Sequence, residues 1–130
     1  MKLLLDTHVF LWLVDGNPNL TKVAEVALAD PSNELFLSVA SVWELAIKTA
    51  NPKQQLILAD PLDEYVTRWT QVYELNELPI RTPHALRLAG LPDHHRDPFD
   101  RILIAQASVE GMTLVSADGK FAPYPVPLLW

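Results

Sequence analysis

"KLLLD" (residues 2–6), which leads directly into "THVFLWLV" (7–14), is the stretch of sequence that decides the fold. The first run is short and apolar, as expected of a strand buried on both faces of a sheet. The second run predicts a helix, which the breaker cluster Asp15-Gly16-Asn17-Pro18 ends. A buried strand followed at once by a helix is typical of α/β proteins.

The rest of the chain repeats this alternation of strand and helix. We expect further strands at 34–38, 77–80 and 112–116, and an edge strand in the proline-rich tail "FAPYPVPLLW" (121–130). We expect further helices at 20–31 with Thr21 as N-cap, 39–50, 60–75, 82–92 with Thr82 as N-cap, and 98–110 before Gly111. Strands that alternate with helices predict an α/β fold with a mostly parallel sheet.

Length and composition set the class of protein. The 130 residues predict a single domain over 1–130, and 49% hydrophobic with 20% charged residues is an ordinary globular balance. There is no cysteine, which excludes disulfides and thiolate metal sites and suits a reducing, cytoplasmic location. No apolar stretch approaches the roughly 18 residues of a membrane span, so we expect no membrane association.

The net charge of −6 argues against a protein that grips nucleic acid through a broad basic face. An acidic protein could still bind a polyanion if divalent cations lay between the two. The charge instead fits an enzyme that carries several carboxylates for a purpose.

Four carboxylates are expected at one edge of the sheet. In right-handed β–α–β units the carboxyl ends of strands and the N-termini of the following helices share an edge. Asp6 closes the first strand and Asp118 follows the strand at 112–116, whereas Asp100 lies in the first turn of a helix. Glu44 lies further along the helix at 39–50, from which its side chain could reach back to the same edge.

Each of these acids also has a purely structural explanation. Asp6 could only cap the helix that follows, and Asp118 could belong to the turn "SADGK" (116–120). Glu44 could form a helix-surface pair with Lys48, four residues on, although its neighbours along the helix are mostly apolar.

"HHRDPFDRILIAQA" (94–107) places two aspartates three positions apart at the start of a helix. Asp97 stands before Pro98, which makes it a good N-cap with proline at the first helical position. Asp100 lies where a capping box places its acid, which is its structural explanation. We nevertheless assign Asp97 mainly to capping and Asp100 mainly to the site, with the option that Asp97 acts there through a water. The adjacent His94 and His95 are interpreted as a solvated loop pair, and the isolated His8 and His84 as structural.

Clustered carboxylates repel one another unless a cation neutralises them, and a set of oxygen ligands favours Mg²⁺ or Mn²⁺ over zinc. The chemistry such a site suits is metal-assisted hydrolysis of a phosphate ester. The sequence contains no P-loop, dinucleotide-binding or serine-hydrolase motif.

Four segments together resemble the PIN-domain family, and most closely its VapC-like toxins of bacterial toxin–antitoxin pairs. They are "LLLDTHVFLWL" (3–13), "SVASVWELAIK" (38–48), "HHRDPFDRILIAQA" (94–107) and "GMTLVSAD" (111–118). The resemblance covers nearly the whole chain in the right order. It places the family's acids at Asp6, Glu44, Asp100 and Asp118, and its supporting hydroxyls at Thr7 and Ser116.

The resemblance implies a three-layer α/β/α sandwich and Mg²⁺- or Mn²⁺-dependent endoribonuclease activity. It also implies a homodimer that a cognate antitoxin protein inhibits. The alternative is a catalytically inactive PIN-like module that binds protein or RNA. An aspartate-nucleophile phosphatase would need a second aspartate where His8 stands.

The chain departs from the family pattern at two places. His8 stands where Asn or Ser is common, and "NPKQQL" (51–56) replaces a basic, glycine-containing turn, which puts RNA contacts there in doubt. Arg96 and Arg101 flank the acids and could bind phosphate, or could pair with Asp97 and Asp100.

Overall fold

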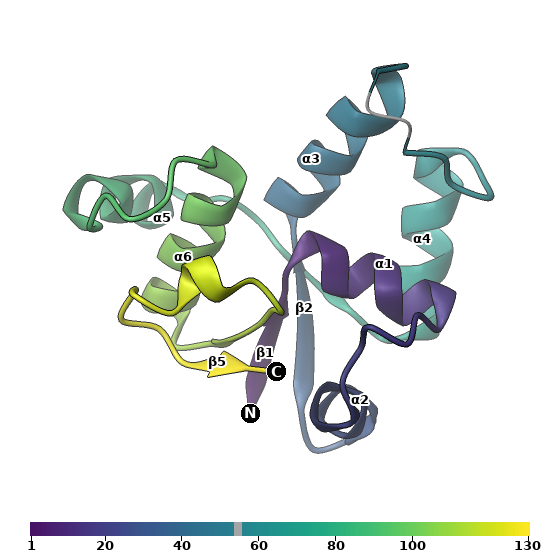
Figure 1. Cartoon of the computed structure of the whole chain (residues 1–130), viewed down its shortest axis with the longest axis horizontal. Helices are drawn as coiled ribbons and strands as arrows, with labels where there is room; N and C mark the ends of the chain where they lie inside the picture. Colours follow the sequence, from purple (N-terminus) through teal and green to yellow (C-terminus); the bar gives the residue numbers. More distant parts are fainter. Residues whose placement is uncertain (54–55) are drawn as a thin grey trace.

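The computed structural model describes residues 1–53 and 56–130 (Figure 1). Its elements follow one another as β1 (Lys2–Leu5), α1 (Thr7–Asp15), α2 (Lys22–Ala29), β2 (Glu34–Ser38), α3 (Val39–Ala50), α4 (Leu62–Val72), β3 (Asn76–Leu78), α5 (Thr82–Arg87), the 3₁₀ turn η1 (Leu88–Gly90), α6 (Pro98–Glu110), β4 (Thr113–Val115), the 3₁₀ turn η2 (Gly119–Phe121) and β5 (Leu128–Leu129). The predicted alternation of strands and helices is confirmed.

The strands form one sheet in the order β3-β2-β1-β4-β5, and every pairing among the described strands is parallel. The central strand is β1, where Leu4 lies opposite Phe36 of β2 and Leu114 of β4. The chain builds outward from β1 to β3, then returns to place β4 on the other side of β1. The strand order therefore reverses between β1 and β4, and in open α/β sheets ligands bind outside the carboxyl ends of the strands at such a switch point.

Helices cover both faces of the sheet, which makes three layers (Figure 1). Along β1, Leu3 and Leu5 pack with side chains of α1, α2 and α4, whereas Leu4 faces the other way and packs with α6. Helix α3 joins both clusters, through Leu45 on one side and Ala40 on the other. In the described residues, no helix is long and apolar enough to cross a membrane.

Local sequence explains where the helices around the sheet edge begin and end. The Asp97 carboxylate accepts hydrogen bonds from the backbone N–H groups of Phe99 (2.9 Å) and Asp100 (3.4 Å), which confirms its predicted role as the N-cap of α6. The same helix ends at Gly111, whose φ of +66° lies in the left-handed region that favours glycine. Thr21 caps α2 as predicted, through a bond from the Ala24 N–H to its hydroxyl.

Two predicted elements differ from the structure. Helix α5 already includes Thr82, so Arg81, not Thr82, is its N-cap, and the helix gives way to the turn η1 at Leu88. The backbone N–H of Arg81 donates a hydrogen bond to Nδ1 of the buried His84 (2.9 Å), three residues further along. The helix predicted over 60–75 is shorter and spans only Leu62–Val72, because the chain turns at Glu74, whose φ is +52°.

Candidate metal centre

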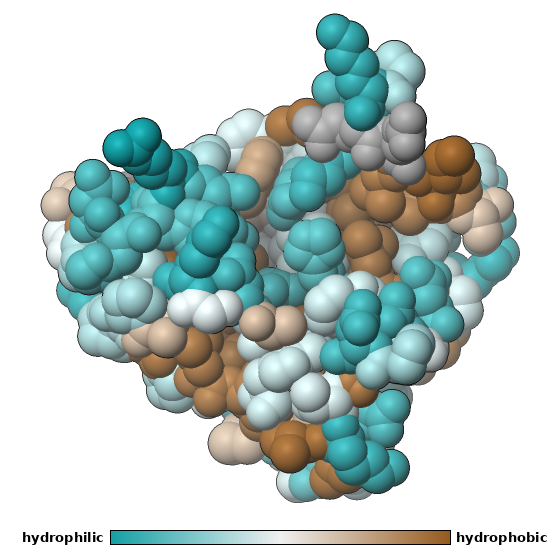
Figure 2. Space-filling view, in the orientation of Figure 1, coloured by the Kyte–Doolittle hydropathy of each residue, from teal (hydrophilic) through white to brown (hydrophobic). Residues whose placement is uncertain are grey.

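The four predicted acids meet in one cavity of about 190 Å³ at the carboxyl edge of the sheet. In Figure 2 the face seen in the view of Figure 1 is hollowed between the α6 side and the side of α1 and α3. The residues that line the cavity are Asp6, Thr7, His8, Glu44, Lys48, His95, Asp97, Asp100, Asp118 and Lys120. The cavity thus lies where the strand order reverses, as the topology requires.

Asp6 caps α1 and also lines the cavity. Its Oδ1 accepts a hydrogen bond from the Val9 N–H (2.8 Å) and so caps α1, whereas its Oδ2 accepts one from the Ser116 hydroxyl. The side chain lines the cavity although the residue is only 6% exposed. Burial raises the pKa of this carboxyl above its usual range, since charge is costly in the interior.

Glu44 is also a buried acid held by two partners. Its Oε1 accepts a hydrogen bond from the Thr7 hydroxyl, and its Oε2 accepts one from Lys48 Nζ, each over 2.6 Å. The pair with Lys48 that the spacing suggested is therefore present. It is not a solvated helix-surface pair, however, because Glu44 is buried and faces the cavity.

Asp100 carries the strongest sign that negative charge accumulates here. Burial, followed by the charges of Asp97, Glu44, Asp6 and Asp118, raises its pKa to about 7. Near neutral pH about half of the molecules would therefore hold a proton on this carboxyl. A divalent cation would offset the repulsion on Asp100 and favour its ionised form.

Asp118 is tied to the first strand through Ser116. The Asp118 N–H donates to the Ser116 hydroxyl (3.0 Å), which in turn donates to Asp6. One oxygen of Asp118 accepts from the Lys120 N–H (2.9 Å) and begins η2, so the turn predicted as its structural role is also present. The expected hydroxyls Thr7 and Ser116 thus hold Glu44, Asp6 and Asp118 relative to one another.

The interpretation of His94 and His95 as a solvated pair is wrong for His95. Its side chain is only 8% exposed, and one potential ligand atom each from His95, Asp100 and Asp118 lie within 4.8 Å of one another. His94 is exposed and packs edge-on against Tyr124. The two neighbours separate because the loop before α6 turns one ring inward, which adjacency in the sequence alone does not reveal.

His8 also differs from its expected structural role, since it is exposed and lines the cavity, with its ring near that of Trp12. His84 is structural as predicted: it is fully buried, and its Nε2 lies 2.8 Å from Glu110 Oε1.

The expected ion pair of Arg101 with Asp97 or Asp100 is wrong, whereas phosphate binding by Arg101 stays a prediction. Within the described residues its guanidinium pairs with no acid, and Arg101 does not line the cavity. Instead it donates to the carbonyl oxygens of Leu88, Pro92 and His95 and to the Tyr124 hydroxyl. Arg101 therefore holds the loop that carries His95 against α6.

Two further sequence features lie apart from the cavity or only partly within the described residues: Arg96 and the segment 51–56. Arg96 is exposed and does not line the cavity. The departure at "NPKQQL" (51–56) includes residues 54 and 55, which lie outside the described residues.

The residues present are chemically suited to a divalent cation. Carboxylate oxygens are the ligands that Mg²⁺ and Mn²⁺ prefer, and five carboxylates line the cavity. Of these, Asp100 and Asp118 form with His95 a group whose potential ligand atoms lie within 4.8 Å of one another, whereas Asp6 and Glu44 are not part of that group. Each of the four predicted acids comes from a different element of the fold, so only the folded chain brings them together.

A parallel α/β sandwich with an acidic cavity at its switch point is the class that the fold and site define. The model of the PIN domain matches residues 3–126, and the chain therefore belongs to the PIN-domain family.

Solved structures of toxin–antitoxin systems share the fold. A chain of VapBC2 from Rickettsia felis, bound to a promoter DNA fragment, aligns with a TM-score of 0.69 at 16% identity, covering 98% of this chain and 97% of that one. A chain of FitAcB from Neisseria gonorrhoeae aligns with a TM-score of 0.70 at 22% identity, covering 97% and 95%. A chain of a toxin–antitoxin complex from Klebsiella pneumoniae gives 0.60 at 23%, covering 94% and 92%. No curated protein matches the sequence.

Proposed function

We propose that this chain, acting as a single domain over residues 1–130, is a metal-dependent endoribonuclease and the toxin of a toxin–antitoxin pair. The observation that carries the proposal is the convergence of Asp6, Glu44, Asp100 and Asp118 from four separate elements in one cavity. Membership of the PIN-domain family and the likeness to VapBC toxins support it.

In this proposal the four carboxylates hold one or two Mg²⁺ or Mn²⁺ ions. The bound metal supplies a water of lowered pKa and neutralises charge on the phosphoryl oxygens, so no protein nucleophile is required. Thr7 and Ser116 orient the carboxylates of Glu44 and Asp6. Asp100 is partly protonated near neutral pH because its pKa is about 7. It would therefore lose this proton when the ion binds, since a metal ligand must be deprotonated.

The proposal for the partners is supported by the solved structures that share the fold. One of them is a toxin–antitoxin complex from Klebsiella pneumoniae. We therefore propose that a cognate antitoxin protein inhibits this chain, that it forms a homodimer, and that it acts on RNA in the cytoplasm.

The test is cleavage of labelled transfer RNA and ribosomal RNA fragments by the purified protein with Mn²⁺ and with EDTA. Asp100→Asn serves as the control for contaminating nucleases, because it removes the charge at nearly constant size, and the Asp100 carboxylate caps no helix. We expect discrete cuts that disappear both in EDTA and in the variant. Cuts that persist in the variant would come from another nuclease. The absence of cuts together with the absence of Mn²⁺ binding in calorimetry would favour the non-catalytic binding module.

A further inference from the structure

His95 is a buried polar side chain that the proposed chemistry leaves without a role. Its side chain is 8% exposed, and its ring packs near that of Phe121. Among the described residues, its Nε2 has no hydrogen-bond partner although it is buried. A buried polar atom without a partner lowers stability, so the position calls for a functional explanation.

A backbone hydrogen bond determines which ring nitrogen carries the proton. The Asp97 N–H donates to His95 Nδ1 over 3.2 Å. A nitrogen that accepts a hydrogen bond carries a lone pair, so the proton of the neutral ring lies on Nε2. In this tautomer Nε2 is a donor and has no lone pair with which to bind a metal ion.

The Nε2–H group faces the one acid that has no donor of its own. Asp6, Glu44 and Asp118 each accept hydrogen bonds, but the Asp100 carboxylate accepts none within the described part of the chain. His95 Nε2 lies 2.9 Å from Asp100 Oδ2, yet the N–H does not point closely enough at the oxygen to form a hydrogen bond. An unused donor and an unheld carboxylate therefore lie side by side.

We propose that His95 is a positioning residue: when Asp100 would bind a divalent ion through Oδ1, a small rotation lets its Oδ2 accept a hydrogen bond from His95 Nε2–H. The inference rests on the proposed function, because it assigns a task toward the metal that the acids would hold. Groups that orient a metal ligand typically change metal affinity when they are removed. The Asp97 backbone, which begins α6, thereby also fixes the tautomer of His95.

The first measurement is Mn²⁺ binding by calorimetry at constant pH. We expect His95→Ala to weaken binding about 10–100-fold. His95→Gln, which keeps an amide N–H in place of Nε2–H, should retain affinity within about threefold of the wild type, since it restores the donor. His94→Ala is the matched control, because the neighbouring ring is exposed and lies outside the cavity, and it should bind as the wild type does.

The second measurement is the tautomer of His95, read from nitrogen NMR of the labelled wild-type protein with and without Mg²⁺. We expect the proton on Nε2 in both states. A proton on Nδ1 in the presence of Mg²⁺ would make His95 a direct ligand and overturn the inference. Unchanged Mn²⁺ affinity in His95→Ala would also overturn it.

The two measurements separate failure of the inference from failure of the proposed function. If the wild type binds no Mn²⁺, the metal centre is absent and both are overturned. If the wild type binds and His95→Ala binds equally well, only the role of His95 is overturned. Should His95→Ala fail to fold, the affinity of His95→Gln and the wild-type tautomer still decide.

Discussion

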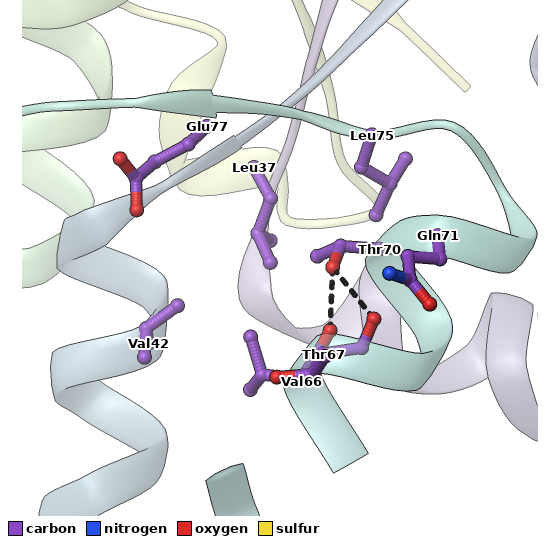
Figure 3. A pocket seen from close by; sticks show the side chains of 8 residues that line it. All are labelled: Leu37, Val42, Val66, Thr67, Thr70, Gln71, Leu75 and Glu77. Atoms are coloured by element: carbon purple, nitrogen blue, oxygen red, sulfur yellow. Dashed lines mark hydrogen bonds between the residues drawn. The ribbon is translucent and has the colours of Figure 1, made fainter. Parts of the chain in front are cut away.

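The acidic cavity and the larger pocket between α3 and α4 make an instructive pair. The α3–α4 pocket has a volume of about 280 Å³, against about 190 Å³ for the acidic cavity. Its walls are Leu37, Val42, Val66, Thr67, Thr70, Gln71, Leu75 and Glu77 (Figure 3). Only Glu77 among them is charged, whereas five carboxylates line the smaller cavity.

The polar groups of the two cavities are also used differently. In the α3–α4 pocket the Thr70 hydroxyl donates to the carbonyl oxygens of Val66 and Thr67 in its own helix (Figure 3). In the acidic cavity, hydroxyls from other elements hold two of the acids, as Ser116 holds Asp6 and Thr7 holds Glu44. Convergence of titratable groups at the switch point, and not pocket size, therefore makes the acidic cavity the candidate functional site.

The largest effect should come from Asp6, which caps α1 and contributes to the acidic cavity. We expect Asp6→Asn and Asp6→Ala both to reduce RNA cleavage by at least about 100-fold, because each removes one of the acids to which the proposal assigns the metal, and not only a group that supports a ligand. Asn can still cap α1, so only Asp6→Ala should also lose about 1 kcal/mol of stability. Cleavage rates and urea unfolding test the pair. Equal stability of the two variants would mean that the cap contributes nothing.

A change of pH should have a smaller effect, on the affinity for Mn²⁺, because in the proposed function the ion displaces the Asp100 proton. Because the pKa of Asp100 is raised to about 7, affinity should rise with pH and level off above that value. Below it the change should approach about tenfold per pH unit for one displaced proton. Calorimetry over a pH series measures this, and an affinity that is constant from pH 5 to about 7 would contradict the coupling.

Without metal, the same carboxyl should make stability fall as pH rises. The folded protein binds the Asp100 proton more tightly than the unfolded chain, because its pKa rises from 3.8 to about 7. The stabilisation is complete below pH 3.8 and is lost as pH rises through about 7. Unfolding experiments in EDTA should show a smaller decline over this window for Asp100→Asn than for the wild type. An unchanged decline would assign the effect to other groups.

Asp97 should show a moderate effect on stability, because its side chain caps α6. We expect Asp97→Ala to lose about 1 kcal/mol, whereas Asp97→Asn keeps the cap and most of the stability. If capping is its main role, Asp97→Asn should also retain most of the RNA cleavage. A loss of cleavage as large as that of Asp6→Asn would instead place Asp97 among the essential acids.

The smallest effect should come from the α3–α4 pocket. Thr67 and Gln71 are exposed, and their substitution by alanine should change stability by no more than about 0.5 kcal/mol. RNA cleavage should remain at the wild-type rate. A clear loss of cleavage in either variant would show that this pocket takes part in the activity.

Local patterns predict the elements that local forces determine. Helix α3 spans 39–50 and α6 spans 98–110, as expected, because caps, breakers and glycine mark their ends. That the acids lie at one edge of the sheet was also predictable, since the carboxyl ends of parallel strands share an edge. Their meeting in one cavity was not, because their mutual distances depend on the strand order.

The sequence could not predict features that depend on distant contacts. The placement of β4 beside β1, which creates the switch point, follows from tertiary packing. The inward turn of His95 depends on a loop that Arg101 fixes through backbone carbonyls, and any residue supplies such carbonyls. A basic residue beside two acids therefore suggested ion pairs that the structure does not form.

The hydrogen bond between Ser116 and Asp6 joins positions 110 residues apart. An ion held by Asp6 and Asp118 would close nearly the same span of chain. Cross-links that close long loops restrict the conformations of the unfolded chain most. By mass action, free ion at about 100 times its dissociation constant adds about 2.7 kcal/mol to stability. The concentration of free divalent metal in the cell would then govern both the catalytic rate of this protein and its resistance to proteases.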